Sequence, residues 1–195
     1  MPKKPPPKRA RNAAATREAI LVSARRAFAR AGYDGVGLRE IAAGAGVTAV
    51  LVNRYFGSKE QLFAEVLQDT MRDPVILTAE TLASPSGEKL AAALVELTKE
   101  GATPLDGFLI MHRSGSSARA AEIGRAEIEK RYQKILAPAL GGPDAQQRAA
   151  ILISLVAGFQ IMRQMIGLSA LTRANSKTLL KLLTPLFQQL VDSPD

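Results

Sequence analysis

The chain has 195 residues, of which 47% are hydrophobic and 23% charged, so it can bury a core and form one or two small domains. It contains no cysteine, which excludes disulfide bonds and thiolate metal sites, and one histidine, which is too few for an imidazole-based metal site. The formal net charge is +8, which favours an acidic partner such as nucleic acid.

The positive charge is concentrated near the N-terminus. Residues 1–60 carry 12 Lys or Arg against 4 Asp or Glu, whereas the remaining residues carry 14 of each kind. Such segregation is typical of nucleic-acid-binding proteins, because neutralised phosphates release counterions. A basic tail that serves only solubility is the alternative.

Residues 1–15 are predicted to form a disordered basic arm, since they include three consecutive prolines and no acidic residue. The arm could follow DNA phosphates or the minor groove, or remain a solvated tail. Its cations are Lys3, Lys4, Lys8, Arg9 and Arg11.

Two helices are predicted next. Thr16 is expected to cap the first, which has a helical stripe of apolar residues that includes Ile20 and Phe28. Gly32 is expected to end it. The second begins near residue 38 and is broken by Gly44 and Gly46, where the chain must turn.

A third and a fourth helix follow in quick succession. Thr48 is a good N-cap for the third helix, in which Val52 and Phe56 lie on one side. Gly57 ends it, and Ser58 opens a capping box that starts the fourth helix. Two short helices across a glycine turn indicate a helix-turn-helix, whose second helix enters the DNA major groove.

From about Thr16 to Phe63 the sequence resembles the TetR family of transcriptional regulators, whose pattern near the third helix is roughly V-S-x-G-x-L-Y-x-H-F-x-S-K-E-x-L. The matching residues are Val47, Thr48, Val52, Arg54, Tyr55, Phe56, Ser58, Lys59, Glu60 and Leu62. Three positions depart from the family pattern. Val50 replaces the usual Gly, Asn53 replaces the usual Tyr, and Gly37 stands where Thr or Ser often caps the second helix.

The resemblance implies an all-α fold, with an N-terminal three-helix helix-turn-helix domain and a larger helical C-terminal domain for ligand binding and dimerisation. The expected limits are 16–63 for the DNA-binding domain and 64–195 for the effector-binding and dimerisation domain.

Several side chains of the motif are candidates for DNA contacts. Arg39 could bond both acceptors of a guanine, Asn53 could pair with an adenine, and Val50 could pack on a thymine methyl. The others suit phosphate or further base contacts. The predicted DNA-binding residues are Arg39, Thr48, Ala49, Val50, Asn53, Arg54, Tyr55 and Lys59.

From residue 59 onward, helices are predicted over 59–71, 90–101, 105–111, 118–136, 144–166 and 176–191. Loop signals at 84–87, 114–117 and 141–144 separate them. In the helix over 118–136 the residues expected to face inward are Ile123, Ile128, Tyr132 and Ile135.

The helix over 144–166 is apolar on two sides, and a two-fold partner could cover the second side. A larger core within one chain is the alternative. The predicted dimer-interface residues are Ile151, Leu155, Gly158, Leu179, Leu183 and Leu186.

A small-molecule effector pocket is predicted around the only histidine, whose imidazole could orient a polar ligand group. These residues could equally belong to the core or the surface. The predicted effector-binding residues are Phe108, Met111, His112, Phe159 and Met162.

No phosphate-binding loop, dinucleotide fingerprint or nucleophile elbow is present, so we expect neither enzymatic activity nor a cofactor or metal. No secretory signal is recognisable, and the 14-residue uncharged run 149–162 is shorter than the ~18–20 residues of a membrane span, so a cytoplasmic location is expected. The expected function is that of a homodimeric repressor, released from a palindromic DNA operator by a small molecule. A nonspecific DNA-binding protein and, less favoured, a helical enzyme are the alternatives.

Overall fold

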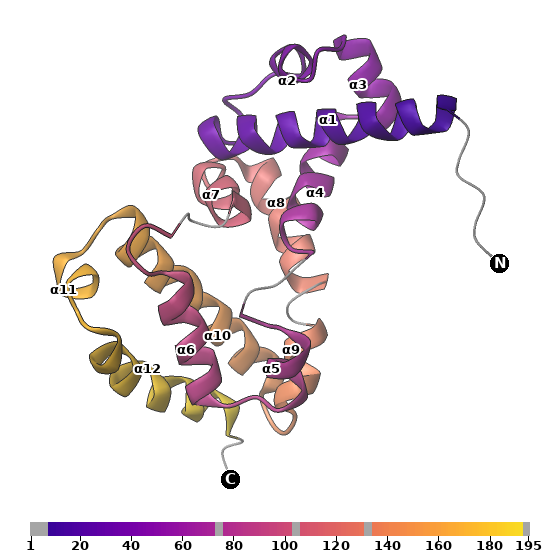
Figure 1. Cartoon of the computed structure of the whole chain (residues 1–195). Helices are drawn as coiled ribbons and strands as arrows, with labels where there is room; N and C mark the ends of the chain where they lie inside the picture. Colours follow the sequence, from indigo (N-terminus) through magenta and orange to yellow (C-terminus); the bar gives the residue numbers. More distant parts are fainter. Residues whose placement is uncertain (1–7, 73–75, 103–105, 131–133, 193–195) are drawn as a thin grey trace. The chain divides into compact units, whose positions relative to one another are not determined.

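The computed structural model describes residues 8–72, 76–102, 106–130 and 134–192, and within these ranges every regular element is a helix (Figure 1). The predicted all-α fold is confirmed for this part of the chain. The chain divides into two compact units. Unit 1 comprises Met1–Met71 and Leu105–Arg125, and unit 2 comprises Arg72–Pro104 and Ala126–Asp195.

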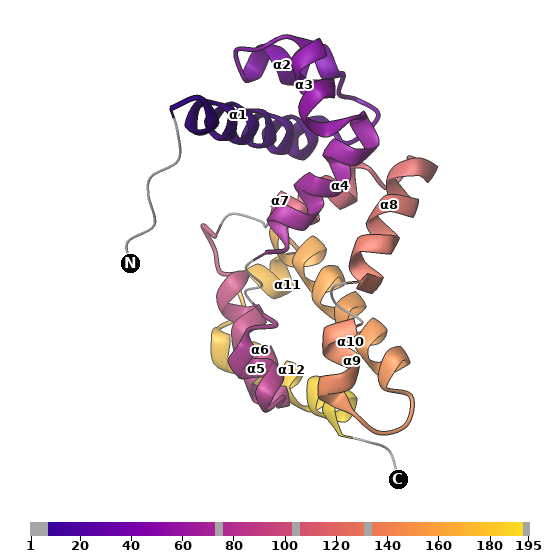
Figure 2. The same ribbon diagram turned by 90° about the vertical axis from the view of Figure 1, so that its right-hand side faces the viewer.

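Unit 1 is built around its first helix. Its helices are α1 (Lys8–Ala31), α2 (Leu38–Gly44), α3 (Ala49–Phe56), α4 (Lys59–Thr70), α7 (Asp106–Arg113) and the first part of α8 (Ala118–Ile128). Helix α1 packs against α2, α4 and α7, and α3 contacts both α2 and α4 (Figures 1 and 2). Residue 63, the predicted end of the DNA-binding domain, lies inside α4, so the packed unit is larger than that domain.

An aromatic cluster forms the centre of unit 1. The ring of Phe28 on α1 meets the ring of Phe63 on α4 edge to face at a centroid distance of 5.1 Å, and Tyr33 meets Phe63 at 4.9 Å. Phe28 and Phe63 are fully buried, as is Ile20. Aromatic pairs in this geometry contribute beyond the burial of their area. The predicted core role of Ile20 and Phe28 is confirmed.

The first helix differs from its prediction. It begins at Lys8, eight residues before Thr16, so residues 8–15 are helical and residues 1–7 lie outside the described part. Thr16 does not cap it, because its hydroxyl donates to the carbonyl of Asn12 one turn earlier, at 2.8 Å. Three consecutive alanines before Thr16 carry strong helix propensity, which extends the helix past the expected cap.

Gly32 ends α1 where the chain approaches α7 closely. Its φ is +69°, and a Cβ at this position would lie 2.3 Å from the carbonyl oxygen of Arg113. Next to it, the Tyr33 amide donates to the Ser114 hydroxyl at 2.9 Å. The segment 114–117, predicted as a flexible break, thus begins with a buried and hydrogen-bonded serine.

Unit 2 is a helical bundle with its own core. Its helices are α5 (Ala79–Ala83), α6 (Gly87–Leu97), α9 (Lys134–Leu140), α10 (Ala145–Gln160), the π-helix η2 (Ile161–Met165), α11 (Ser169–Thr172) and α12 (Ser176–Val191). Helices α6 and α12 pack along each other, and α10 packs against α9 and α12. Leu90, Leu94, Leu152 and Phe187 are almost completely buried in the core between them.

The two long helices predicted in this part of the chain change geometry along their length. Of the helix predicted over 118–136, the described residues are helical, as α8 (Ala118–Ile128), a π-helical turn at 129–130 and the start of α9 at Lys134, and residues 131–133 lie outside the described part. The inward residues of α8 are the small Ala120 and Gly124, whereas Ile135 is 47% exposed, Ile123 and Ile128 are half-buried, and Tyr132 lies outside the described residues. The predicted helix over 144–166 continues as the wider π-helix from Ile161, and the helix over 176–191 is confirmed.

We predict that Gly32→Ala destabilises the protein more than Gly46→Ala. Both glycines have positive φ, a conformation that costs an alanine about 1–2 kcal/mol. Only at Gly32 would the new methyl group also collide with backbone, which adds about 1–3 kcal/mol. Urea denaturation of the full chain measures both variants, and equal losses of stability would contradict the close approach.

Candidate nucleic-acid interface

Helices α2 and α3 and the four residues between them form a helix-turn-helix. Ile41 and Ala42 of α2 are buried, as predicted. Gly46 takes a positive φ of 67° in the turn. The Thr48 hydroxyl then accepts a hydrogen bond from the Leu51 amide at 3.3 Å, which confirms Thr48 as the N-cap of α3.

Helix α3 has a buried and an exposed side. Val52 and Phe56 face the core, where they are 1% and 6% exposed. Val50, Asn53 and Arg54 are exposed, and Val50 reaches 79%. Because positions i, i+3 and i+4 share one face of a helix, these three side chains form a single surface. A large apolar side chain held in solvent beside an amide and a guanidinium has the chemistry to read base edges and thymine methyl groups.

The junction between α3 and α4 is tightly defined. Gly57 ends α3 with φ of +79°, and its amide donates to the Asn53 carbonyl at 2.7 Å. The Ser58 hydroxyl accepts from the Gln61 amide at 3.2 Å, so the predicted cap of α4 is confirmed. These bonds fix the angle at which α3 leaves the core.

The other predicted DNA-binding residues lie on the same motif. Arg39 is exposed on α2, Thr48 is exposed at the start of α3, and Ala49 and Tyr55 are half-buried. The Lys59 ammonium lies 4.3 Å from the centroid of the Tyr33 ring, so a contact within the chain already orients this cation. The structure therefore gathers all eight predicted residues on α2, α3 and the first turn of α4.

Two arginines that sequence reasoning missed hold the motif to its support. Arg17 on α1 lies over the Phe56 ring at 4.7 Å and forms an ion pair with Glu65 of α4. Arg30 of α1 pairs with Glu40 of α2. Their partners are 10 to 48 residues away, and no local pattern indicates such pairs.

The electrostatics at the start of α4 involve one carboxylate. Hydrogen bonds from its own backbone amide and the Ser58 side chain lower the pKa of Glu60, as expected for an anion at a helix N-terminus. Burial raises the pKa of the Tyr33 hydroxyl, and the Glu60 charge adds to the shift. Tyr33 thus remains neutral at physiological pH.

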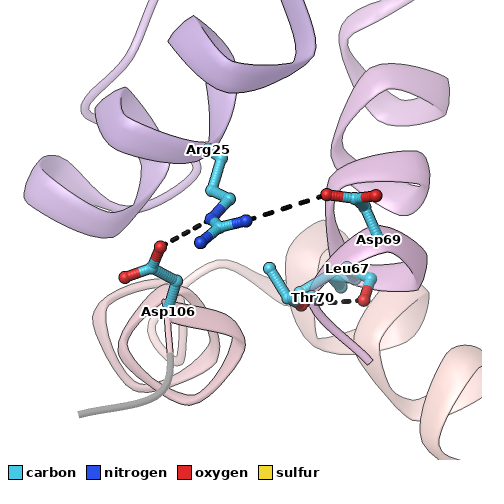
Figure 3. A network of polar contacts seen from close by, with 5 residues as sticks. All are labelled: Arg25, Leu67, Asp69, Thr70 and Asp106. Atoms are coloured by element: carbon cyan, nitrogen blue, oxygen red, sulfur yellow. Dashed lines mark hydrogen bonds and ion pairs between the residues drawn. The ribbon is translucent and has the colours of Figure 1, made fainter. Parts of the chain in front are cut away.

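Three helices of unit 1 meet at Arg25 (Figure 3). From α1, its Nε donates to Asp106 of α7 at 2.6 Å, and its Nη1 lies 3.9 Å from Asp69 of α4. Beside it, the Thr70 hydroxyl donates to the Leu67 carbonyl at 2.8 Å. Arg25 is about half exposed, so this bridge contributes to the orientation of α4 more than to stability.

The five predicted effector-binding residues are divided between the units. Phe108, Met111 and His112 are on α7 in unit 1, where His112 is exposed and the Met111 side chain packs close to Gly124. Phe159 and Met162 are in unit 2. The Phe159 ring centroid is 5.9 Å from the guanidinium carbon of Arg163, and Met162 is 46% exposed.

The predicted dimer residues separate into buried and exposed sets. Leu179 and Leu183 are 3% and 6% exposed and belong to the core of their own chain, so little of their surface is left for a partner. Ile151 and Leu186 are 54% and 47% exposed, and Leu155 is half-buried. A Cβ added at Gly158 would meet no atom within 4 Å.

The described ranges contain no group of three or more His, Asp or Glu residues placed to hold a metal ion. No described helix is both long enough and apolar enough to span a membrane.

Helix-turn-helix geometry in unit 1 and a separate helical bundle in unit 2 define a two-part helix-turn-helix protein. Residues 20–66 match the family model of bacterial regulatory proteins of the TetR family, and residues 85–191 match that of the tetracyclin repressor-like C-terminal domain. The chain belongs to the TetR family, as its sequence motif predicts.

Individual known proteins match this chain either over part of its length or at low sequence identity. The HTH-type transcriptional regulator BetI of Agrobacterium fabrum is 38% identical over 78 residues, which cover 39% of this chain and 38% of that protein. A TetR-family regulator from Streptomyces coelicolor A3 is 27% identical with a TM-score of 0.57, over 97% of this chain and 99% of its own. AibR in complex with isovaleryl coenzyme A and operator DNA has a TM-score of 0.59 at 17% identity, over 89% and 98%.

We predict that Asn53→Ala weakens binding to the operator by about 1–3 kcal/mol, the discrimination that a bidentate contact to a base provides. Affinity for random DNA should change little, because phosphate contacts dominate there. Gln146→Ala, the same kind of substitution on an exposed position of α10, is the control. Fluorescence anisotropy at fixed salt measures both affinities, and an equal loss on both DNAs would remove Asn53 from base recognition.

Proposed function

We propose that this chain is a DNA-binding transcriptional regulator that acts as a homodimeric repressor, and that a small molecule releases it from a palindromic operator. One observation carries the proposal. The exposed face of α3, formed by Val50, Asn53 and Arg54, is backed by a capped helix and a buried apolar stripe, so it presents a defined surface of the size that enters a major groove.

Exposed apolar residues of unit 2 support dimerisation. Helices α10 and α12 pack together, and Ile151, Leu182 and Leu186 on them are 54%, 60% and 47% exposed. Large apolar side chains grouped on two adjacent helices favour burial against another protein surface. The open space at Gly158 allows a second helix to approach α10 closely. We therefore place the interface on these exposed residues, with Leu179 and Leu183 supporting it from the core.

The proposed mechanism is a shift between two dimer conformations. Two copies of α3 about one DNA turn apart, ~34–36 Å, would bind successive major grooves of a palindrome. An effector that binds better to a conformation with another spacing would lower operator affinity by its differential affinity for the two states. AibR, whose structure contains both isovaleryl coenzyme A and operator DNA, is a precedent with a similar fold.

We predict that negative charge placed on the proposed interface weakens the dimer. The double variant Leu182→Glu and Leu186→Glu should weaken dimerisation at least about a hundredfold, because burying unpaired carboxylates costs several kcal/mol. Lys177→Glu places a carboxylate on another exposed position of α12 and should leave the dimer intact. Sedimentation velocity at micromolar concentration measures the result, and a double variant that sediments like the wild type would move the interface elsewhere.

The function is tested by selecting genomic fragments on the full-length protein and titrating them at physiological salt. A specific regulator binds its site about 10³–10⁷ times more tightly than random DNA. We expect a selected palindrome with affinity in this range. Equal affinity for selected and random DNA, together with a steep salt slope, would instead indicate a nonspecific DNA-binding protein.

A further inference from the structure

Unit 2 contains a pocket of about 350 Å³, a volume within the range of small-molecule sites. Its walls are residues 98–102 after α6, Arg163 and Gln164 of η2, Gly167, and Thr172 of α11. Among the described residues of this lining, Ala102 is the only one with an aliphatic side chain, so the lining suits a hydrophilic molecule rather than a hydrocarbon chain.

A buried cation forms part of the wall. Arg163 is 7% exposed, and its Nη1 donates to the Thr98 hydroxyl at 2.9 Å and to the Val95 carbonyl at 3.2 Å. Among the described residues, no carboxylate forms an ion pair with it, and its Nε and Nη2 make no hydrogen bond. Burial lowers the pKa of this guanidinium, which still stays charged. A buried charge without a counter-ion is costly, and an anion bound beside it would offset that cost.

A second buried arginine in unit 2 shows the contrasting case. Arg148 is 6% exposed, and all three of its nitrogens donate to carbonyls. Its Nε bonds Pro143 at 3.1 Å, its Nη1 bonds Leu190 at 3.1 Å, and its Nη2 bonds Gly141. This guanidinium ties the loop before α10 to the end of α12. Arg163 differs because two of its nitrogens remain available for a ligand.

Neutral polar groups complete the wall. The Gln164 amide nitrogen is held by the carbonyls of Leu97 and Ala102 at 3.3 and 3.4 Å, while its buried Oε1 has no partner in the described part of the chain. Thr172 adds a hydroxyl. Both arginine and glutamine lie on the π-helix, a rare geometry that occurs frequently at functional sites.

The other charged residues at the pocket lie nearer to solvent. Lys99 forms an ion pair with Glu96 at 2.5 Å, and the Glu100 carboxylate is exposed. The buried and unpaired charge at the pocket is therefore that of Arg163, and the planar guanidinium fork matches a carboxylate or a phosphate.

We propose that this pocket binds a small hydrophilic molecule that carries a carboxylate or phosphate, with the anion on Arg163 and a hydroxyl group on Thr172. The effect of this ligand on DNA binding rests on the proposed function, because only a DNA-binding regulator can release DNA. Binding itself requires only the free protein.

Calorimetry of the full-length protein without DNA tests the site with three molecules that share one carbon skeleton. Gluconate carries a carboxylate, glucose 6-phosphate carries a phosphate, and glucose is neutral. We expect at least one of the two anions to bind about tenfold or more tightly than glucose, as charge-assisted hydrogen bonds provide, and the preferred anion identifies the head group. Affinities that do not differ between the anions and glucose would overturn the proposal.

Substitutions locate the binding site. Arg163→Met should remove the preference for the anion, and Arg163→Lys should retain part of it, because the charge remains while the fork is lost. Arg173→Met makes the same change at an exposed arginine next to the pocket and should bind like the wild type. An Arg163→Met variant that keeps the preference would contradict the assignment.

A measurement on the unsubstituted protein covers the case in which Arg163→Met fails to fold. The ¹⁵N signal of the Arg163 Nε–H group, assigned with Arg163→Lys, should move on addition of the anion that binds. An unchanged signal during binding would place the anion elsewhere. Specific operator binding without any anion binding would overturn the pocket assignment and leave the regulator function standing. Anion binding without release of DNA would support the site and remove only its effector role.

Discussion

The attachment of α3 to the buried core of unit 1 is the constraint on which DNA binding depends. A helix of eight residues is not stable alone in water, so its orientation must come from packing. Val52 and Phe56 provide the buried stripe, Arg17 stacks on Phe56, and the caps at Thr48 and Ser58 fix both ends. With these positions determined, the opposite face can be held ready for DNA without a further change of structure.

The interior of unit 2 contains a packed core and a polar pocket. Its leucine-rich core joins α6, α10 and α12, and the carbonyl contacts of Arg148 hold the start of α10 to the end of α12. Around Arg163 the same unit leaves polar groups partly unsatisfied next to a pocket. A fully satisfied network stabilises one conformation, whereas a partly satisfied one can gain free energy from a ligand.

The features that the sequence predicts well are local. The caps at Thr48 and Ser58 and the stripe of Val52 and Phe56 are confirmed, because each depends on residues within one or two turns. The start of α1 was misplaced because helix propensity outweighed a plausible cap at Thr16. In α8 the small residues Ala120 and Gly124 face inward, and a pattern search that follows large apolar residues passes over them.

Long-range contacts could not be predicted. Arg163 contacts Thr98 across 65 residues, and nothing near either residue indicates that an arginine in an apolar helix lines a pocket. The burial of Leu179 and Leu183 depends in the same way on how α12 meets α6. A leucine pattern predicts a buried face without saying whether the same chain or a second copy covers it.

Hydroxyl-radical footprinting of the full-length protein on its selected DNA is the most direct test of the central claim. The account predicts two protected segments related by a two-fold axis, with centres one helical turn or a multiple of it apart, about 34–36 Å per turn. Uniform protection that does not recur with the helical turn of the DNA, or a single protected segment, would contradict a dimer that reads DNA with two copies of α3.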